Sequence, residues 1–107
     1  MNQSDLVTSV SNAITQMDTL LMSGTPPFNS PPWQQLFALR KHLDDQQRTL
    51  VQQAIQADDA AFQTAAGTVQ TATKGLTTAI SQQAAVDSII NIVSQISAGD
   101  DGVLKLV

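Results

Sequence analysis

The sequence contains no cysteine and only one histidine among its 107 residues. Without cysteine, the chain can form neither a disulfide framework nor a thiolate metal site. A single histidine then leaves only carboxylates as additional ligands, which makes a poor site for zinc or similar ions. We therefore expect no metal centre and no cofactor.

Charged residues are also scarce, at 13% of the chain against a typical ~25%. All nine acidic residues are aspartate, and five basic residues bring the net charge to −4. A negative chain lacks the electrostatic attraction that drives binding to nucleic acid and to anionic membranes. A surface that is polar but almost uncharged resists the approach of another protein less than a charged surface does. This favours self-association or a protein partner.

Long hydrophobic runs are missing as well. Apolar residues make up 42% of the chain, but no stretch approaches the ~20 apolar residues of a membrane-spanning helix. The first residues carry no basic side chain and lead into an amphipathic stretch, so the sequence predicts no cleavable signal peptide. The expected location is cytoplasmic, or outside the cell after export that does not use such a signal.

The most regular feature of the sequence is an apolar stripe between residues 62 and 96. Its members recur at spacings of three and four, with the polar Gln83 at one position between Ala79 and Val86. This spacing places them along one side of an α-helix that another helix must cover, as in a coiled coil. A chain of this length builds one modest core, so we expect a single helical domain. The stripe consists of Phe62, Ala65, Val69, Ala72, Leu76, Ala79, Val86, Ile90 and Val93.

The residues at the start of the chain predict a first helix over about 4–23. Ser4 is placed to cap its first turn, and Gly24 follows the last periodic residue, where a glycine ends many helices. All four prolines follow within residues 26–32. They form a stiff connector that returns the chain antiparallel to the first helix.

A second helix is predicted over about 31–57, because Ser30 followed by proline is typical of an N-cap and a first helical residue. Its end is open between two alternatives. Asp58-Asp59 can separate it from a third helix over 60–97, or both segments can form one rod of roughly 100 Å. We favour the break, because half of such a rod would lack a partner in the same chain.

The third helix is expected to end at Ala98-Gly99, which leaves residues 98–107 as a turn followed by a short apolar tail. The predicted fold is therefore all-α. Its helices form an up-down-up three-helix bundle, or an extended helical hairpin, with a long third helix.

Reactive side chains are few and poorly placed for catalysis. His42 is flanked by charged residues in a segment that we expect to be solvated, although Asp45 lies three residues further on the same helix. The neighbours Asp44 and Asp45 point about 100° apart on a helix and cannot share a proton. The pair Asp100-Asp101 lacks the alternating oxygen ligands of a calcium loop. We therefore expect no enzymatic activity.

Three of the four aromatic residues, Phe28, Trp33 and Phe37, lie at the proline connector. Aromatic side chains around a rigid turn are typical anchors of protein interfaces. The same side chains could instead close the open end of a helical hairpin. We select these three residues as candidates for protein binding.

A second candidate group consists of Ile89, Ile92 and Ile96, which lie outside the apolar stripe. They exceed what a three-helix core needs, so we expect them to face another surface. Together with the aromatic residues they predict a non-catalytic helical protein–protein interaction module. Such a module associates with itself as a homo-oligomer or with a specific protein partner.

A cysteine-free, acidic helical hairpin of this size with a proline turn resembles the small subunits of bacterial secretion systems, such as needle proteins and WxG-type exported proteins. The resemblance implies a signal-less secreted or filament-forming structural subunit. Trp33-Gln34-Gln35 lacks the glycine of the WxG turn, so no functional residue is carried over. A further alternative is a small acidic immunity or chaperone-like antagonist of a toxin or effector.

Overall fold

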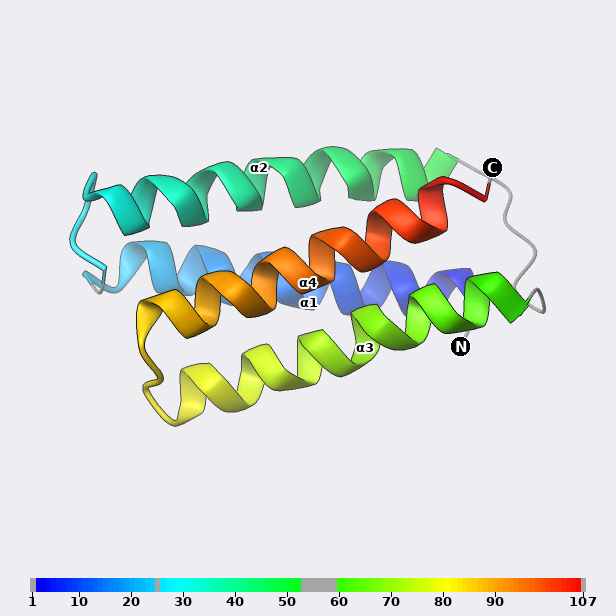
Figure 1. Ribbon diagram of the computed structural model, residues 1–107. Coiled ribbons are helices and arrows are strands. Elements are labelled where there is room, and N and C mark those ends of the chain that lie inside the picture. Colours follow the sequence, from blue (N-terminus) through cyan, green and yellow to red (C-terminus); the bar gives the residue numbers. More distant parts are fainter. Residues whose placement is uncertain (1, 25, 53–59, 107) are drawn as a thin grey trace.

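In the part of the chain that the structure describes, four stretches form α-helices, and each buries one apolar face. The computed structural model describes residues 2–24, 26–52 and 60–106. Within these ranges there is no strand, and the predicted all-α class is confirmed with four helices rather than three. The helices are α1 (Gln3–Met22), α2 (Pro31–Gln52), α3 (Ala60–Ser81) and α4 (Val86–Leu104) (Figure 1).

The helices form two antiparallel hairpins, α1 with α2 and α3 with α4, which pack side by side (Figure 1). Helix α1 also packs on α3, and α2 packs on α4, so the helices occupy the corners of a square with α1 and α4 on one diagonal. The molecule measures 41 × 23 × 17 Å. A single rod through α2 and α3, roughly 100 Å long, does not fit these dimensions, so that alternative is wrong.

The core lies along the centre of the square and receives side chains from every helix. Each fully buried large side chain stabilises the fold by about 1.5–3 kcal/mol. The largest of them are Leu6, Val10, Met17, Leu36, Leu43, Leu50, Phe62, Val69, Leu76, Val93, Ile96 and Val103. None of the helices in the described ranges combines the length and the apolar character that crossing a membrane requires.

Helix α1 begins earlier than the sequence suggests, because Asn2 rather than Ser4 is its N-cap. Asn2 Oδ1 accepts a hydrogen bond from the backbone N–H of Asp5 at 2.8 Å, and the Asp5 carboxylate accepts one from the N–H of Asn2 at 3.2 Å. This reciprocal capping box satisfies two free N–H groups, where a lone serine would satisfy one. At the other end, Gly24 adopts a left-handed backbone with φ +86°, as its predicted role in ending the helix requires.

Helix α2 begins where the sequence predicts. Ser30 Oγ accepts a hydrogen bond from the N–H of Trp33 at 3.4 Å, the pattern of an N-cap, and Pro31 is the first helical residue. The predicted end of this helix at residue 57 and the break at Asp58-Asp59 lie outside the described residues.

The helix predicted over 60–97 is divided in two, which corrects the three-helix prediction. Gln83 has a left-handed backbone with φ +55°. Its N–H donates to the carbonyl of Ile80 at 3.1 Å, and the N–H of Ala84 donates to the carbonyl of Ala79 at 2.9 Å. These bonds form a Schellman motif, which satisfies the last carbonyls of α3. An undivided helix would be roughly 57 Å long, so its end would extend beyond the 41 Å molecule without partners.

Helix α4 continues to Leu104, so the predicted turn and tail over 98–107 are wrong. Val103 is completely buried. Gly99 allows α4 to approach α3 so closely that a Cβ atom there would lie 2.6 Å from Val69 Cγ2. This packing outweighs the low helix propensity of the glycines and aspartates in the segment.

Candidate functional site

The connection between α1 and α2 and the connection between α3 and α4 lie at the same end of the molecule (Figure 1). We call it the turn end. Two hollows lined by described residues open there. One is lined by residues of α1, the proline connector and α2, and the other lies between α1 and the α3–α4 hairpin. The candidate site consists of these two hollows.

The aromatic cluster, Phe28, Trp33 and Phe37, lies beside the first hollow. Trp33 and Phe37 are four residues apart on one face of α2, and their rings stack with centroids 5.2 Å apart and planes 8° apart. Phe28 reaches Trp33 from the connector in an edge-to-face arrangement, with centroids 4.8 Å apart. Aromatic pairs of this kind add about 0.5–1.5 kcal/mol beyond the area they bury. The structure thus brings together the three aromatic residues that the sequence singled out.

Trp33 fixes the aromatic cluster to α1. Its indole N–H donates a hydrogen bond to the carbonyl of Leu21 at 2.9 Å. This carbonyl belongs to the last turn of α1, where carbonyl groups have no partner within the helix. An ion pair between Arg40 Nε and Asp18 Oδ1 at 2.9 Å adds a second link between α1 and α2. The hydrogen bond to Asp18 also raises the pKa of Arg40 above its ordinary value.

The first hollow is surrounded by apolar side chains that remain in contact with solvent. Phe28 is 78% exposed and Phe37 42% exposed, while Met22 at the end of α1 is 87% exposed. The hollow between them has a volume of about 540 Å³, and its lining includes Leu21 and Trp33. Its size and lining suit one or two apolar side chains of another molecule.

Lys41 extends the aromatic cluster along α2. Its Nζ lies 5.8 Å from the centroid of the Phe37 ring, within the range of a cation–π interaction. His42, the next residue, is exposed, in agreement with the solvated position that its charged neighbours predict. In the described part of the chain, no three His or Asp side chains come close enough together to hold a metal ion.

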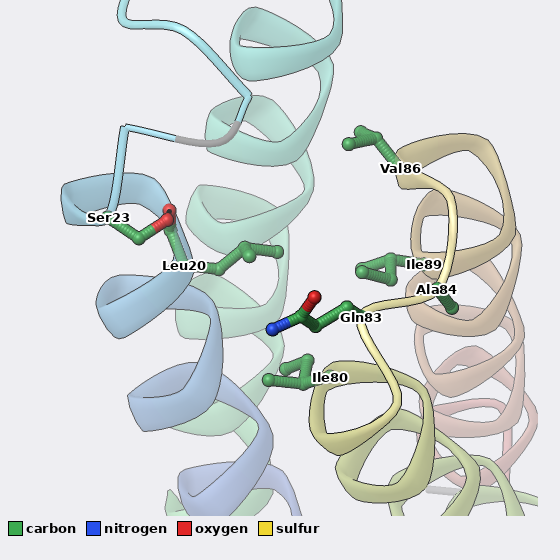
Figure 2. A pocket seen from close by; sticks show the side chains of 7 residues that line it. All are labelled: Leu20, Ser23, Ile80, Gln83, Ala84, Val86 and Ile89. Atoms are coloured by element: carbon green, nitrogen blue, oxygen red, sulfur yellow. Dashed lines mark hydrogen bonds between the residues drawn. The ribbon is translucent and has the colours of Figure 1, made fainter.

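The second hollow, which we call the apolar cleft, has a volume of about 500 Å³. Figure 2 shows Leu20 of α1 on one side and three apolar side chains of the α3–α4 hairpin on the other, all directed into the space between: Ile80, Val86 and Ile89. The cleft therefore lies between the two hairpins, and the side chains of neither hairpin fill it.

Gln83 brings a polar group into this apolar lining. Its side-chain amide extends from the α3–α4 turn toward Leu20 (Figure 2). The left-handed backbone of Gln83 costs about 1 kcal/mol relative to glycine, and residues held in such conformations gather at functional sites. An amide carries both donors and an acceptor, so Gln83 is placed to bind a polar group of a chain whose apolar side chains enter the cleft.

The three isoleucines selected from the sequence have different surroundings. Ile89 lines the apolar cleft but is only 3% exposed, and Ile96 is completely buried in the core. Ile92 is half-buried and packs against the core. The expectation that they face another surface is wrong for Ile96, because α4 folds back on α3 and uses these side chains to fill a four-helix core.

Sequence reasoning misses the apolar cleft, because the α3–α4 turn creates it. The stripe nevertheless carries a signal of this turn. After Ala79 the next apolar member is Val86, so the spacing of three and four skips one position, and Gln82-Gln83 occupies the gap. The skipped position is Gln83, and the helix ends just before it, at Ser81.

The chemistry of the two hollows is that of apolar contact. Among the residues that line them, Asp18 is the one with an ionisable side chain, and its carboxylate is paired with Arg40. No protein-family model, curated protein or solved structure matches the chain.

Proposed function

We propose that this chain is a non-catalytic helical protein–protein interaction module, whose turn end binds an apolar segment of a protein partner or of a second copy. The observation that supports the proposal is the exposure of Met22, Phe28 and Phe37 around one hollow. These are three of the five exposed large hydrophobic residues in the described part of the chain. Exposed apolar residues that gather in one place mark interaction sites, whereas scattered ones do not.

The rigidity of the turn end favours binding. Trp33 is held by its hydrogen bond to α1 and by stacking on Phe37, so the wall of the first hollow exists before a partner arrives. A preformed wall loses little conformational entropy on binding. Aromatic side chains at the centre of an interface are its commonest hot spots, each worth about 2 kcal/mol or more.

Self-association provides the first test. We would measure sedimentation equilibrium from micromolar to millimolar concentration, for the wild type and for a Phe28→Ser/Phe37→Ser variant. We expect the variant to associate at least about tenfold more weakly, since a lost hot spot costs about 2 kcal/mol or more and about 1.4 kcal/mol already corresponds to a factor of ten. The exposure of both side chains means that the fold should be retained, which circular dichroism would verify.

Val51 supplies the matched control. It is 63% exposed on α2 and lies outside the aromatic cluster, so Val51→Ser removes an exposed apolar side chain at a different place. Association of this variant should equal that of the wild type. The proposal fails if Val51→Ser weakens association as much as the aromatic variant does, or if the wild type associates and neither variant changes it.

If the wild type stays monomeric, the next experiment tests binding to another protein. A photocrosslinking residue at position 28 should then capture a discrete partner in the native cell, and the same residue at position 51 should not. Identical products from both positions would contradict a binding site at the turn end.

The concentration series also separates the alternatives. Growth of scattering without limit supports a filament-forming subunit of a secretion-type assembly. A monomer that forms a discrete complex with one protein supports an immunity or chaperone-like antagonist. In both cases the same aromatic substitutions should weaken the contact.

A further inference from the structure

A carboxyl group occupies a core position of α4. Asp100 is completely buried, like Ile96 and Val103, which precede and follow it on the same face of the helix. On one side of it, Gly99 packs against α3, and on the other side Asp101 contacts α2. The Asp100 side chain therefore lies between these two contacts, on the face that is directed toward the centre of the bundle.

Neither oxygen of the Asp100 carboxyl group has a hydrogen-bond partner among the residues that the structure describes. The buried amide of Gln46 on α2 is engaged elsewhere, because its Nε2 donates to the Ser97 carbonyl at 3.1 Å and to Asp101 Oδ1 at 2.6 Å. A charged carboxylate without partners is far more costly to bury than a neutral carboxyl group.

The described residues provide no cation to offset a negative charge at Asp100. On the other helices, Asp5 of α1, Arg48 of α2 and Lys74, the one charged residue of α3, are exposed. Lys105, which follows α4, is exposed as well. Burial, and then the charge of Asp101, raises the pKa of Asp100 from 3.8 to about 7. The carboxyl group therefore changes its charge near neutral pH.

The segment around Asp100 is an intrinsically weak helix. Residues 99–102 are Gly-Asp-Asp-Gly, and both residue types rank low in helix propensity. The segment lies in the C-terminal part of α4, where a negative charge opposes the helix dipole. The local sequence favours a turn here, so the helix is held together by its burial against α2 and α3. Conflicts of this kind between local preference and overall fold are typical of functional segments.

We propose that Asp100 makes the C-terminal end of α4 a pH-sensitive conformational switch. While the carboxyl group is neutral, residues 97–104 pack against α2 and α3. When it loses its proton to solvent, the uncompensated charge favours release of this segment, which uncovers the face of α3 around Ala65 and Val69. The preceding part of α4, Val86 to Ile96, remains packed. The switch lies at the end of the molecule opposite to the turn end (Figure 1), so it does not depend on the proposed function.

Amide hydrogen exchange of the full chain, followed residue by residue by NMR between pH 5 and pH 8, tests the switch. Protection factors correct for the intrinsic effect of pH on exchange and report the opening equilibrium of each segment. For residues 97–104 we expect this equilibrium constant to rise about 50-fold from pH 5 to pH 7 and to level off above pH 7. Residues 86–96 should show no such rise.

Two variants of the same helix distinguish the switch from a general effect of pH. Asp100→Asn removes the titrating group at nearly constant size and should abolish the rise, whereas Asp101→Asn should retain it. The proposal is overturned if Asp100→Asn keeps the pH dependence, or if residues 86–96 lose protection together with 97–104. A ¹³C titration of the wild type needs no substitution, and ionisation of the Asp100 carboxyl near pH 4 would also overturn the proposal.

Discussion

At the scale of single residues, Asp100 links the stability of the whole fold to pH. The folded chain keeps the proton of Asp100 up to about pH 7, whereas an unfolded chain loses it near pH 3.8. The stability linked to this group is therefore fully present below pH 3.8 and decreases as the pH rises through this range, by about 1.4 kcal/mol per pH unit. Above pH 7 both states are ionised and no further loss occurs. An aspartate stabilised by a salt bridge would show the opposite sign.

Urea unfolding between pH 4 and pH 8 measures this effect. We expect the free energy of unfolding of the wild type to fall as the pH approaches neutrality. The Asp100→Asn variant should show a much weaker dependence on pH and should be more stable than the wild type at pH 8. A wild-type stability that increases steadily from pH 4 to pH 8 would contradict the raised pKa of Asp100.

Single residues also differ in how well their positions follow from sequence. Phe28, Trp33 and Phe37 were recognisable because a rigid connector and a spacing of four on one helix hold them together. Asp100 was not, because Gly-Asp-Asp-Gly has the local character of a turn. Only the packing of Val103 behind it and of Gly99 beside it places this carboxyl group in the core.

At the scale of the elements, the contact between α3 and α4 depends on a glycine. Gly99→Ala would place a Cβ atom 2.6 Å from Val69 Cγ2 and 3.3 Å from the backbone oxygen of Ala65, so the helices would have to separate. We expect a loss of about 1–3 kcal/mol of stability. Gly67→Ala is the matched control, since a Cβ atom there meets nothing within 4 Å. Gly67→Ala should increase the free energy of unfolding by up to about 1 kcal/mol. Thermal unfolding would show whether the two substitutions have opposite signs.

The turn between α3 and α4 offers a second prediction at this scale. Gln83→Gly removes the cost of a side chain in the left-handed region and should stabilise the chain by about 0.5–1 kcal/mol. The preceding residue, Gln82, does not have a positive φ, so Gln82→Gly should bring no gain. If the Gln83 amide helps to bind a partner, Gln83→Gly should also weaken association while it stabilises the fold. Urea unfolding combined with sedimentation equilibrium measures both quantities.

The starts of helices were easier to predict than their continuity. Ser30 and Pro31 form a local signal, and they located the start of α2. The division between α3 and α4 depends on how far the neighbouring helices extend. Its one local signal is the polar pair Gln82-Gln83 within the apolar stripe, and one polar position alone does not end a helix. The apolar stripe runs on with similar spacing through both helices, so it resembles one long helix.

At the scale of the whole molecule, two hairpins side by side give a short body. The radius of gyration of the Cα atoms is 13.6 Å, close to the ~13 Å expected for a compact domain of this length. Small-angle X-ray scattering, extrapolated to zero concentration, should give a value slightly above this for the monomer. A continuous helix over 60–97 or a rod through α2 and α3 would give a clearly larger value, and such a result would contradict the fold-back at residues 82–85.

The arrangement of the hairpins could not be derived from the sequence. Periodicity shows that each helix has a buried face, but it does not show which helix covers it. The order around the square, with α2 and α3 on one diagonal, follows from the simultaneous packing of α1 on α3 and of α2 on α4. The all-helical class and the antiparallel return after α1 required only local patterns, and both were predicted.

The stacked indole at the turn end has a practical consequence. Trp33 is the only tryptophan of the chain, and there is no tyrosine, so intrinsic fluorescence originates almost entirely from one wall of the first hollow. A partner that enters this hollow will change the emission without any attached dye. Release of the distant end of α4 will leave the emission nearly unchanged. Trp33 fluorescence therefore distinguishes binding at the turn end from opening at the opposite end of the molecule.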